Sequence, residues 1–174
     1  MSWPTERAVV VRRTVRVVLI DEAERVLLFA DSDPGLPELT WWVTPGGGMD
    51  PGETESETAI REVAEETGHA LTADQLLGPI ARRHVRHGYS DQIVDIVSEV
   101  FYAARVPGFE VDTSGHTEDE QLTLTEHRWW PRADLERTDA WLWPDCLAGL
   151  VSRVISGELA LVDLGEMEES TRPV

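Results

Sequence analysis

The segment GGMDPGETESETAIREVAEETG, residues 47–68, constrains the fold of this chain more than any other stretch. It holds six glutamates, one aspartate and a single arginine, and it also carries strong helix signals. Thr54 and Glu57 match a capping box, and Gly68 stands where a C-terminal cap is expected. The pattern therefore predicts a helix from about Glu55 to Thr67, directly after the glycine-rich stretch PGGG.

The predicted helix gathers its negative charge on one face. Glu62, Glu65 and Glu66 stand at i, i+3 and i+4, so their carboxylates project from the same side. Like charges at these spacings destabilise a helix by a few tenths of a kcal/mol each, roughly, so something should offset the repulsion. Two readings stay open from the spacing alone: the cluster is simply solvated, or a divalent cation lies among the oxygens.

The residues around the cluster favour a cation. The glycines at 46–48 supply backbone that adopts unusual dihedrals and approaches a ligand closely. Arg61, inside the cluster, could pair with Glu53 or Glu65 and hold that carboxylate in a fixed rotamer. Hard carboxylate oxygens on a helix suit Mg²⁺, which keeps several waters and bridges to substrate phosphates.

Residues 47–69 resemble the signature of the Nudix hydrolase family. That signature is a Gly, five residues, a Glu, seven residues, then Arg-Glu-aliphatic-any-Glu-Glu-any-Gly-aliphatic. The matching residues are Gly47, Glu53, Arg61, Glu62, Val63, Glu65, Glu66 and Gly68. Only His69 departs, at an aliphatic position that packs the end of the helix, so the mismatch concerns packing and leaves the chemistry intact.

The resemblance implies a fold and an activity. The fold class is α/β (α+β), a Nudix-type α/β/α sandwich with a mixed β-sheet. The activity is metal-dependent hydrolysis of the diphosphate linkage of a nucleotide or nucleoside diphosphate conjugate, with Mg²⁺ or Mn²⁺ as cofactor. Glu62, Glu65 and Glu66 would be the metal ligands, and Arg61 and Glu53 would orient them.

Further residues are assigned around this predicted metal site. The backbone of Gly46, Gly47 and Gly48 would shape the loop beside the ion. The general base is left open between Glu62 inside the signature and two carboxylates outside it, Glu120 and Glu126, which could instead be additional ligands. For Glu118, Asp119 and Glu120, a solvated loop is the competing interpretation.

The sequence predicts the residues that contact the substrate less clearly than it predicts the metal site. Arg82, His84 and Arg86 share one face of a predicted strand in the basic island ARRHVRH, where they could meet substrate phosphates or pair with surface carboxylates. The tryptophans at 41, 42, 129 and 130 could stack on a base or pack in the core. The sequence does not choose among a damaged nucleoside triphosphate, a nucleotide sugar, ADP-ribose, a dinucleotide and a capped RNA end.

Two alternatives to a Nudix hydrolase are weighed. A non-catalytic, nucleotide-binding Nudix-like sensor would usually lack signature carboxylates, all of which are present here. An isopentenyl diphosphate isomerase would need a cysteine near the site, whereas the lone Cys146 falls in a predicted terminal helix. A metal-dependent hydrolase is therefore favoured.

The rest of the chain predicts one domain over 1–165, followed by a flexible acidic tail over 166–174. The expected elements are a hairpin within 14–30, strands at 40–43, 78–87 and 92–106, a polar loop at 107–121 and a helix within 144–157. The net charge of −18 argues against nucleic acid as a partner except as a 5′-end substrate. We read no signal peptide and no membrane span, and expect a cytoplasmic protein; the resemblance makes a homodimer plausible.

Overall fold

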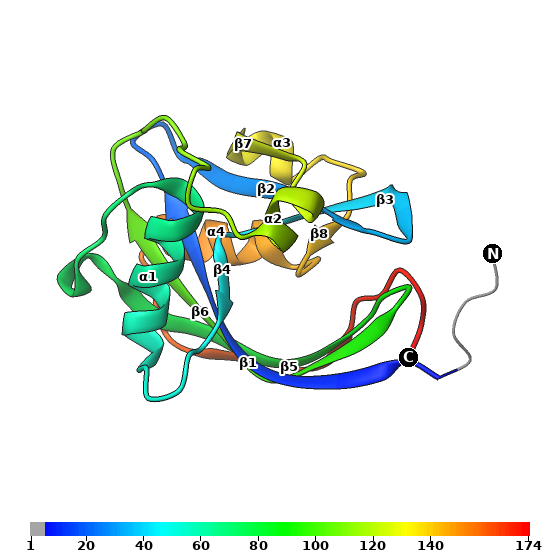
Figure 1. Cartoon of the computed structure of the whole chain (residues 1–174). Helices are drawn as coiled ribbons and strands as arrows, with labels where there is room; N and C mark the ends of the chain where they lie inside the picture. The colour runs from blue at the N-terminus through cyan, green and yellow to red at the C-terminus, as the bar shows by residue number, and fades with distance from the viewer. Residues whose placement is uncertain (1–5) are drawn as a thin grey trace.

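A curled, mixed β-sheet organises the chain in the computed structural model, which describes residues 6–174 (Figure 1). The start of the predicted domain, and of the stretch read for a signal peptide, lies outside those residues. The strands are β1 (Ala8–Ile20), β2 (Arg25–Asp33), β3 (Leu36–Val43), β4 (Gly46–Gly48), β5 (Leu77–Gly88), β6 (Gln92–Arg105), β7 (Glu126–Pro131), β8 (Leu142–Trp143) and β9 (Val162–Glu168). The helices are α1 (Glu55–Thr67), α2 (Glu118–Thr123), α3 (Arg132–Leu135) and α4 (Leu147–Ile155), with a 3₁₀ turn at Ala73–Gln75.

The sheet order explains how the elements reach one another. The path runs β8-β3-β2-β1-β6-β5-β9, with β4 also paired to β1 and β7 to β2. The central strand β1 is antiparallel to β2 and β4 but parallel to β6. The predicted hairpin is thus confirmed as β1 and β2, and the glycine-rich stretch after β3 adds to the sheet as β4.

Two apolar clusters lie on opposite faces of the sheet because side chains alternate along β1. One face packs against α1 through Val15, Val17, Leu19, Ala59 and Val63. The other packs against α4 through Val18, Ile20, Leu147, Leu150 and Val151. Helices therefore cover both faces of a mixed sheet, which confirms the predicted mixed α and β fold.

Helix α1 has the limits that the sequence predicts. The hydroxyl of Thr54 accepts from the Glu57 amide at 3.2 Å, and the Glu57 carboxylate accepts from the Thr54 amide at 2.8 Å. Gly68 ends the helix at a φ of 76°. The ring of His69 stacks on Phe109 with centroids 4.3 Å apart, so an aromatic contact replaces the aliphatic packing usual at that position.

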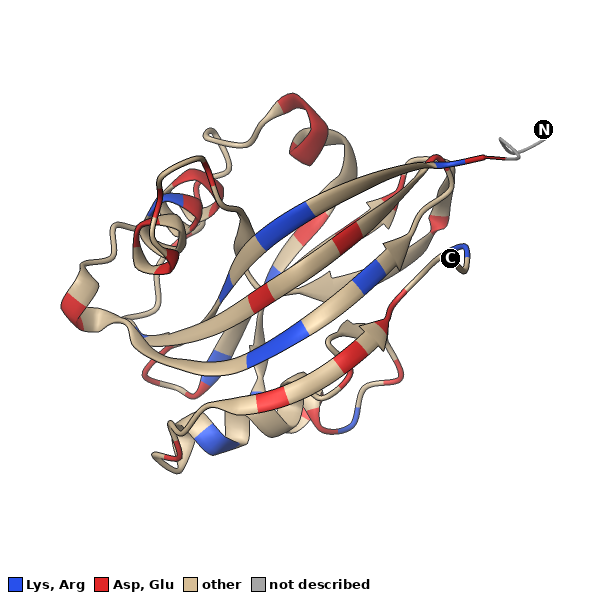
Figure 2. Cartoon of the chain, turned by 90° about the horizontal axis from the view of Figure 1, so that it is seen from below, with Lys and Arg blue, Asp and Glu red and all other residues tan. Residues whose placement is uncertain are grey.

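Charge complements the order of the strands on one side of the sheet. Figure 2 shows basic β1, acidic β6, basic β5 and acidic β9 lying side by side. Opposite charges on facing residues of neighbouring strands stabilise a sheet. The innermost contact is the Glu99 carboxylate, 1% exposed, which is 2.6 Å from Arg83 and 3.2 Å from Arg16.

Glu99 is expected to make the stability of the fold depend on acid. Burial alone would raise its pKa, but Arg83 and Arg16 overcome that effect and hold the pKa at about 2. Because the folded pKa lies below the unfolded value of about 4.3, the stabilisation is complete above that value and is lost as pH falls towards 2. Urea unfolding at pH 7, 4 and 3 should show Glu99→Gln losing less stability than wild type on acidification, by about 2 kcal/mol; parallel losses would contradict this role.

Two segments, α2 and β9, differ from the sequence prediction, and the structure narrows the limits of a third, α4. Helix α2 occupies the end of the predicted polar loop and is capped by Thr117 and Glu120. Helix α4 begins at Leu147, three residues after Pro144. Strand β9 runs to Glu168, inside the region 166–174 expected to be a flexible tail, and Thr171 and Arg172 then donate to the Gly88 carbonyl at 3.0 Å. Pairing with β5 explains why these C-terminal residues form regular structure, since the acidic sequence of β9 has no strand pattern of its own.

Candidate active site

Three carboxylates converge where α1 and α2 meet. Glu62 and Glu66 come from α1 and Glu120 from α2, and one oxygen of each lies within 4.8 Å of the others. Glu62 and Glu66 are 6% and 4% exposed. Because Glu62 and Glu66 are four residues apart on α1, they point to the same side, and α2 supplies the third oxygen from a distant part of the chain.

Burial makes the charge of this cluster costly. It raises the pKa of Glu66 well above its ordinary value, although Arg16 and a 2.9 Å hydrogen bond from the Gly46 amide oppose the shift. Burial also raises the pKa of Glu62, against the effect of Arg61. Carboxylate oxygens that are close together and poorly compensated are the ligand set that a hard divalent cation prefers, so these residues fit Mg²⁺ or Mn²⁺.

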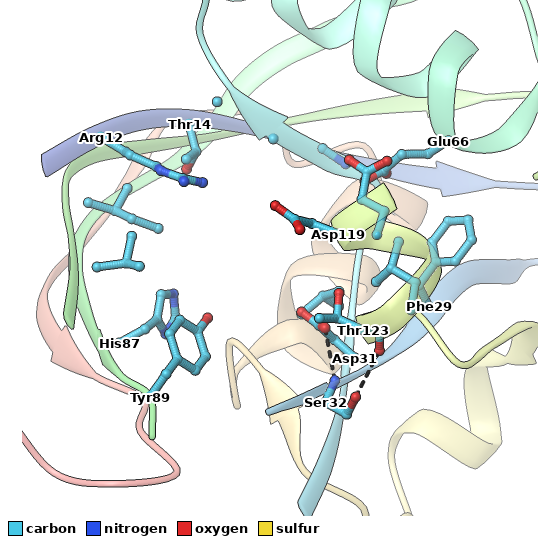
Figure 3. Close-up of a pocket in the computed structure, with 18 of the residues that line it drawn as sticks. Arg12, Thr14, Phe29, Asp31, Ser32, Glu66, His87, Tyr89, Asp119 and Thr123 are labelled. Atoms are coloured by element: carbon cyan, nitrogen blue, oxygen red, sulfur yellow. Dashed lines mark hydrogen bonds between the residues drawn. The ribbon is translucent and has the colours of Figure 1, made fainter. Parts of the chain in front are cut away.

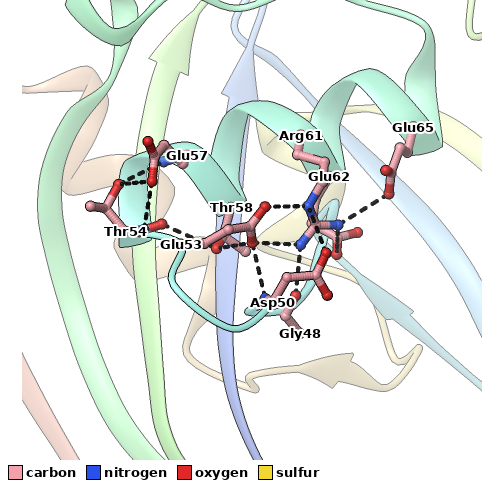
Figure 4. Close-up of polar contacts among 9 residues, drawn as sticks. All are labelled: Gly48, Asp50, Glu53, Thr54, Glu57, Thr58, Arg61, Glu62 and Glu65. Atoms are coloured by element: carbon pink, nitrogen blue, oxygen red, sulfur yellow. Dashed lines mark hydrogen bonds and ion pairs between the residues drawn. The ribbon is translucent and has the colours of Figure 1, made fainter.

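Arg61 holds one side of the cluster in place (Figure 4). It donates to both oxygens of Glu53, at 2.6 and 2.8 Å, and this pairing is the main reason that the pKa of Glu53 falls to about 2. It also donates to Glu62 at 2.8 Å, Glu65 at 3.1 Å and the Gly48 carbonyl at 2.9 Å. Glu53 therefore acts through Arg61, which fixes the carboxylate of Glu62.

Two glycines allow β4 to run against the cluster. At Gly47 a Cβ atom would lie 2.6 Å from the carboxylate carbon of Glu62. Gly46 has a φ of 149°, and a Cβ there would lie 2.1 Å from the Val15 carbonyl oxygen. Only residues without a side chain bring the backbone this close to the carboxylates.

A cavity of about 400 Å³ opens beside the cluster. In Figure 3, Arg12 and Thr14 form one wall, Glu66 and Asp119 mark the carboxylate end, and Asp31 lies across from His87 and Tyr89. Within residues 6–174, the backbone of Arg12 pairs with β6, but its guanidinium makes no hydrogen bond or ion pair. The cavity thus joins a carboxylate cluster and an unpaired guanidinium in one space.

The family match rests on most of the chain. The family model described as NUDIX domain matches residues 10–148. The chain belongs to the Nudix family. A solved structure similar to this Nudix domain is the MutT protein from Methanosarcina mazei Go1, with a TM-score of 0.58 and 17% identity over 90% of this chain and all of that chain.

Curated relatives match over shorter stretches. A protein of Bacillus subtilis (strain 168) named as a candidate 8-oxo-dGTP diphosphatase is 36% identical over 66 residues, 38% of this chain and 41% of the relative. An RNA pyrophosphohydrolase of Erythrobacter litoralis (strain HTCC2594) is 48% identical over 56 residues, 32% of each chain. The matches therefore span less than half the length of these relatives. Within residues 6–174, no helix is long and apolar enough to cross a membrane.

The Nudix signature residues do not all lie in the cluster. Glu65 points to Arg61, with its side chain 48% exposed, and is outside the group of three. Glu120, offered by the sequence only as a further ligand or base, takes the third place. Glu126 lies on β7, half exposed beside Arg128 at 3.3 Å, and does not line the cavity.

The predicted phosphate contacts lie on the wrong face of β5. Arg82 is 3.7 Å from Glu55, and Arg86 is 3.9 Å from Asp95, so both pair with surface carboxylates. Alternation along the strand turns His87 towards the cavity instead. Of the two readings left open for this face, the structure shows the ion pairs.

The tryptophans mainly pack against other aromatic rings. Trp41, 1% exposed, stacks on Trp143 at 4.1 Å, and Trp42 meets Trp130 edge to face at 5.0 Å. Several residues that line the cavity escaped the sequence prediction, among them Arg12, Asp31 and Tyr89. Their sequence surroundings carry no motif, and only the tertiary structure brings them together.

Proposed function

We propose that this Nudix domain hydrolyses the diphosphate linkage of a nucleotide or nucleoside diphosphate conjugate with Mg²⁺ or Mn²⁺. The observation that carries the proposal is the convergence of Glu62, Glu66 and Glu120 at one end of a cavity that also contains the free guanidinium of Arg12. Relatives named as a diphosphatase and a pyrophosphohydrolase support the same reaction class.

Each residue has a role in this reaction. Glu62, Glu66 and Glu120 would hold the ion, which, when bound, neutralises the diphosphate and lowers the pKa of an attacking water. Arg61, fixed by Glu53, keeps Glu62 in position. Arg12 reaches the cavity from β1 and offers a planar fork of N–H donors that matches phosphate oxygens.

We assign the proton acceptor to Glu120. Its side chain is half-buried at the cavity, whereas Glu62 and Glu66 are buried. It accepts one hydrogen bond, from the Thr117 amide at 2.8 Å, so further lone pairs are free to take a proton. A positioned carboxylate of this kind contributes about 10²- to 10⁴-fold to a rate.

Product analysis on a panel of nucleotides and nucleotide conjugates tests the proposal. With Mg²⁺, we expect one substrate class to be cleaved at its diphosphate; with EDTA, turnover should stop. Glu120→Gln should reduce kcat by about 10²-fold or more with the fold retained.

The competing function is a nucleotide sensor without catalysis. If no substrate on the panel is cleaved while nucleotides raise the melting temperature, the sensor replaces the hydrolase. A cytoplasmic location and a homodimer are carried forward as proposals, which cell fractionation and sedimentation would test.

A further inference from the structure

The cavity has a second polar end, away from the carboxylate cluster, formed by Asp31 on β2. Asp31 faces the cavity from the side opposite His87 and Tyr89 (Figure 3). Its Oδ1 accepts from the Ser32 amide at 2.8 Å. Ser32 in turn donates through Oγ to the Thr123 carbonyl at 3.0 Å, which fixes α2 beside Asp31.

Asp31 is only partly compensated by the protein. Burial raises the pKa of its carboxyl group, against the hydrogen bond from the Ser32 amide and the charge of Arg16. A carboxylate has about four acceptor sites, and the Ser32 amide takes one of them, on Oδ1. Acceptors on both oxygens therefore remain for a molecule in the cavity, and N–H donors would relieve the cost of burying the charge.

The charge of Asp31 also decides which part of a nucleotide it meets. Phosphates would be repelled by Asp31 and attracted by Arg12 and by a cation at Glu62, Glu66 and Glu120. Asp31 is outside the group of three metal-type residues found within residues 6–174, so a cation is expected at Glu62, Glu66 and Glu120 and not at Asp31. The uncharged parts of the substrate that carry donors, its sugar hydroxyls and its base, are what remain for Asp31, and only the base differs from one nucleotide to another.

The two adjacent oxygens of the Asp31 carboxylate match two adjacent donors on a ligand. Guanine presents N1–H and the N2 amino group next to each other on its pairing edge, whereas adenine offers one amino group beside an acceptor nitrogen. Uracil and thymine offer a single N–H between two carbonyl oxygens, which a carboxylate repels. The ring of Tyr89, across the cavity and only partly buried, adds surface on which a base can stack.

We propose that Asp31 selects a guanine-type base, so that guanine nucleotides are the preferred ligands of this cavity. This inference rests on the proposed function for the placement of the phosphates at the cluster. It adds a specificity residue that lies outside the Nudix signature and comes from β2.

Calorimetric binding of nucleoside monophosphates, which have no diphosphate linkage to cleave, tests the inference. With Mg²⁺, GMP should bind the wild-type chain about tenfold or more tightly than IMP, which lacks the N2 amino group, or AMP. In Asp31→Asn one acceptor becomes a donor, and GMP affinity should fall about 10- to 100-fold, with AMP affinity within about twofold of wild type. Asn keeps an oxygen for the Ser32 amide, so the fold should be retained, which circular dichroism would check.

Asp91→Asn is the matched control. Asp91 lines the same cavity but is exposed, so the variant removes an equal charge without a buried acceptor and should leave GMP affinity unchanged. Three results would overturn the inference, whatever the chain hydrolyses. GMP and AMP could bind equally tightly, GMP binding could be undetectable, or GMP affinity could be unchanged in Asp31→Asn. If the chain binds GMP selectively but cleaves no substrate, the proposed hydrolysis is refuted and the proposed base preference is supported.

Discussion

Glu66→Gln is expected to lower kcat/KM by about a thousandfold or more, because it removes a charged ligand from the centre of the cluster. The fold should survive, since the Gln oxygen can still accept from the Gly46 amide, now 2.9 Å from Glu66. In EDTA, the variant should melt at the same temperature as wild type or higher, because a neutral amide avoids the burial cost that raises the pKa of Glu66.

Steady-state kinetics and thermal melts, each with Mg²⁺ and with EDTA, check this prediction. Mg²⁺ should raise the melting temperature of wild type and leave that of Glu66→Gln nearly unchanged. Glu126→Gln is the control, because this exposed carboxylate lies outside the cavity and should be dispensable. Full activity in Glu66→Gln, or inactivity in Glu126→Gln, would refute the assignment of the cluster.

Gly47→Ala is expected to reduce kcat/KM by about a hundredfold or more through the position of one carboxylate. The new methyl group would lie 2.6 Å from the Glu62 carboxylate, so either Glu62 leaves the cluster or β4 shifts away from α1. Overpacking of this kind also costs about 1 to 3 kcal/mol of stability.

Gly48→Ala provides a close control for that experiment. A Cβ at Gly48 meets nothing within 4 Å, so the same methyl group one residue later should leave kinetics and stability near wild type. Activity measured over a range of Mg²⁺ concentrations, together with urea unfolding, would separate a displaced ligand from a general loss of fold. If both alanine variants behave alike, close packing at Gly47 is not what positions Glu62.

The sequence predicted α1 well because the information for a capped helix is local. The capping residues, the terminal glycine and the carboxylate face all lie within one segment of the chain. The third carboxylate was harder to place, because Glu120 reaches Glu62 and Glu66 only through the path of the chain from β6 to α2. The path that the chain takes between two distant elements leaves no periodic pattern in the sequence.

Strand parity explains the wrong assignment on β5. Alternation correctly put Arg82 and Arg86 on one face, but it does not tell which face of the sheet carries the site. Strand β9 was missed for a related reason: its sequence VDLGEME has little apolar alternation, and its partners are the basic residues of β5, such as Arg82 opposite Asp163. The fold supplies the complementarity that the isolated segment lacks.

The six residues of α2 connect the two ends of the cavity. Glu120 belongs to the carboxylate cluster, and the Thr123 carbonyl, one helical turn later, accepts from the Oγ of Ser32, the residue next to Asp31. If an ion at the cluster orders Glu120, it should also order Thr123, so the two proposed binding events would share one conformational cost. By thermodynamic reciprocity, a nucleotide that tightens the Asp31 end must raise the affinity for the ion by the same factor as the ion raises the affinity for the nucleotide. We therefore expect the proposed cation and the proposed nucleotide to bind cooperatively, because one short helix joins the two ends of the cavity.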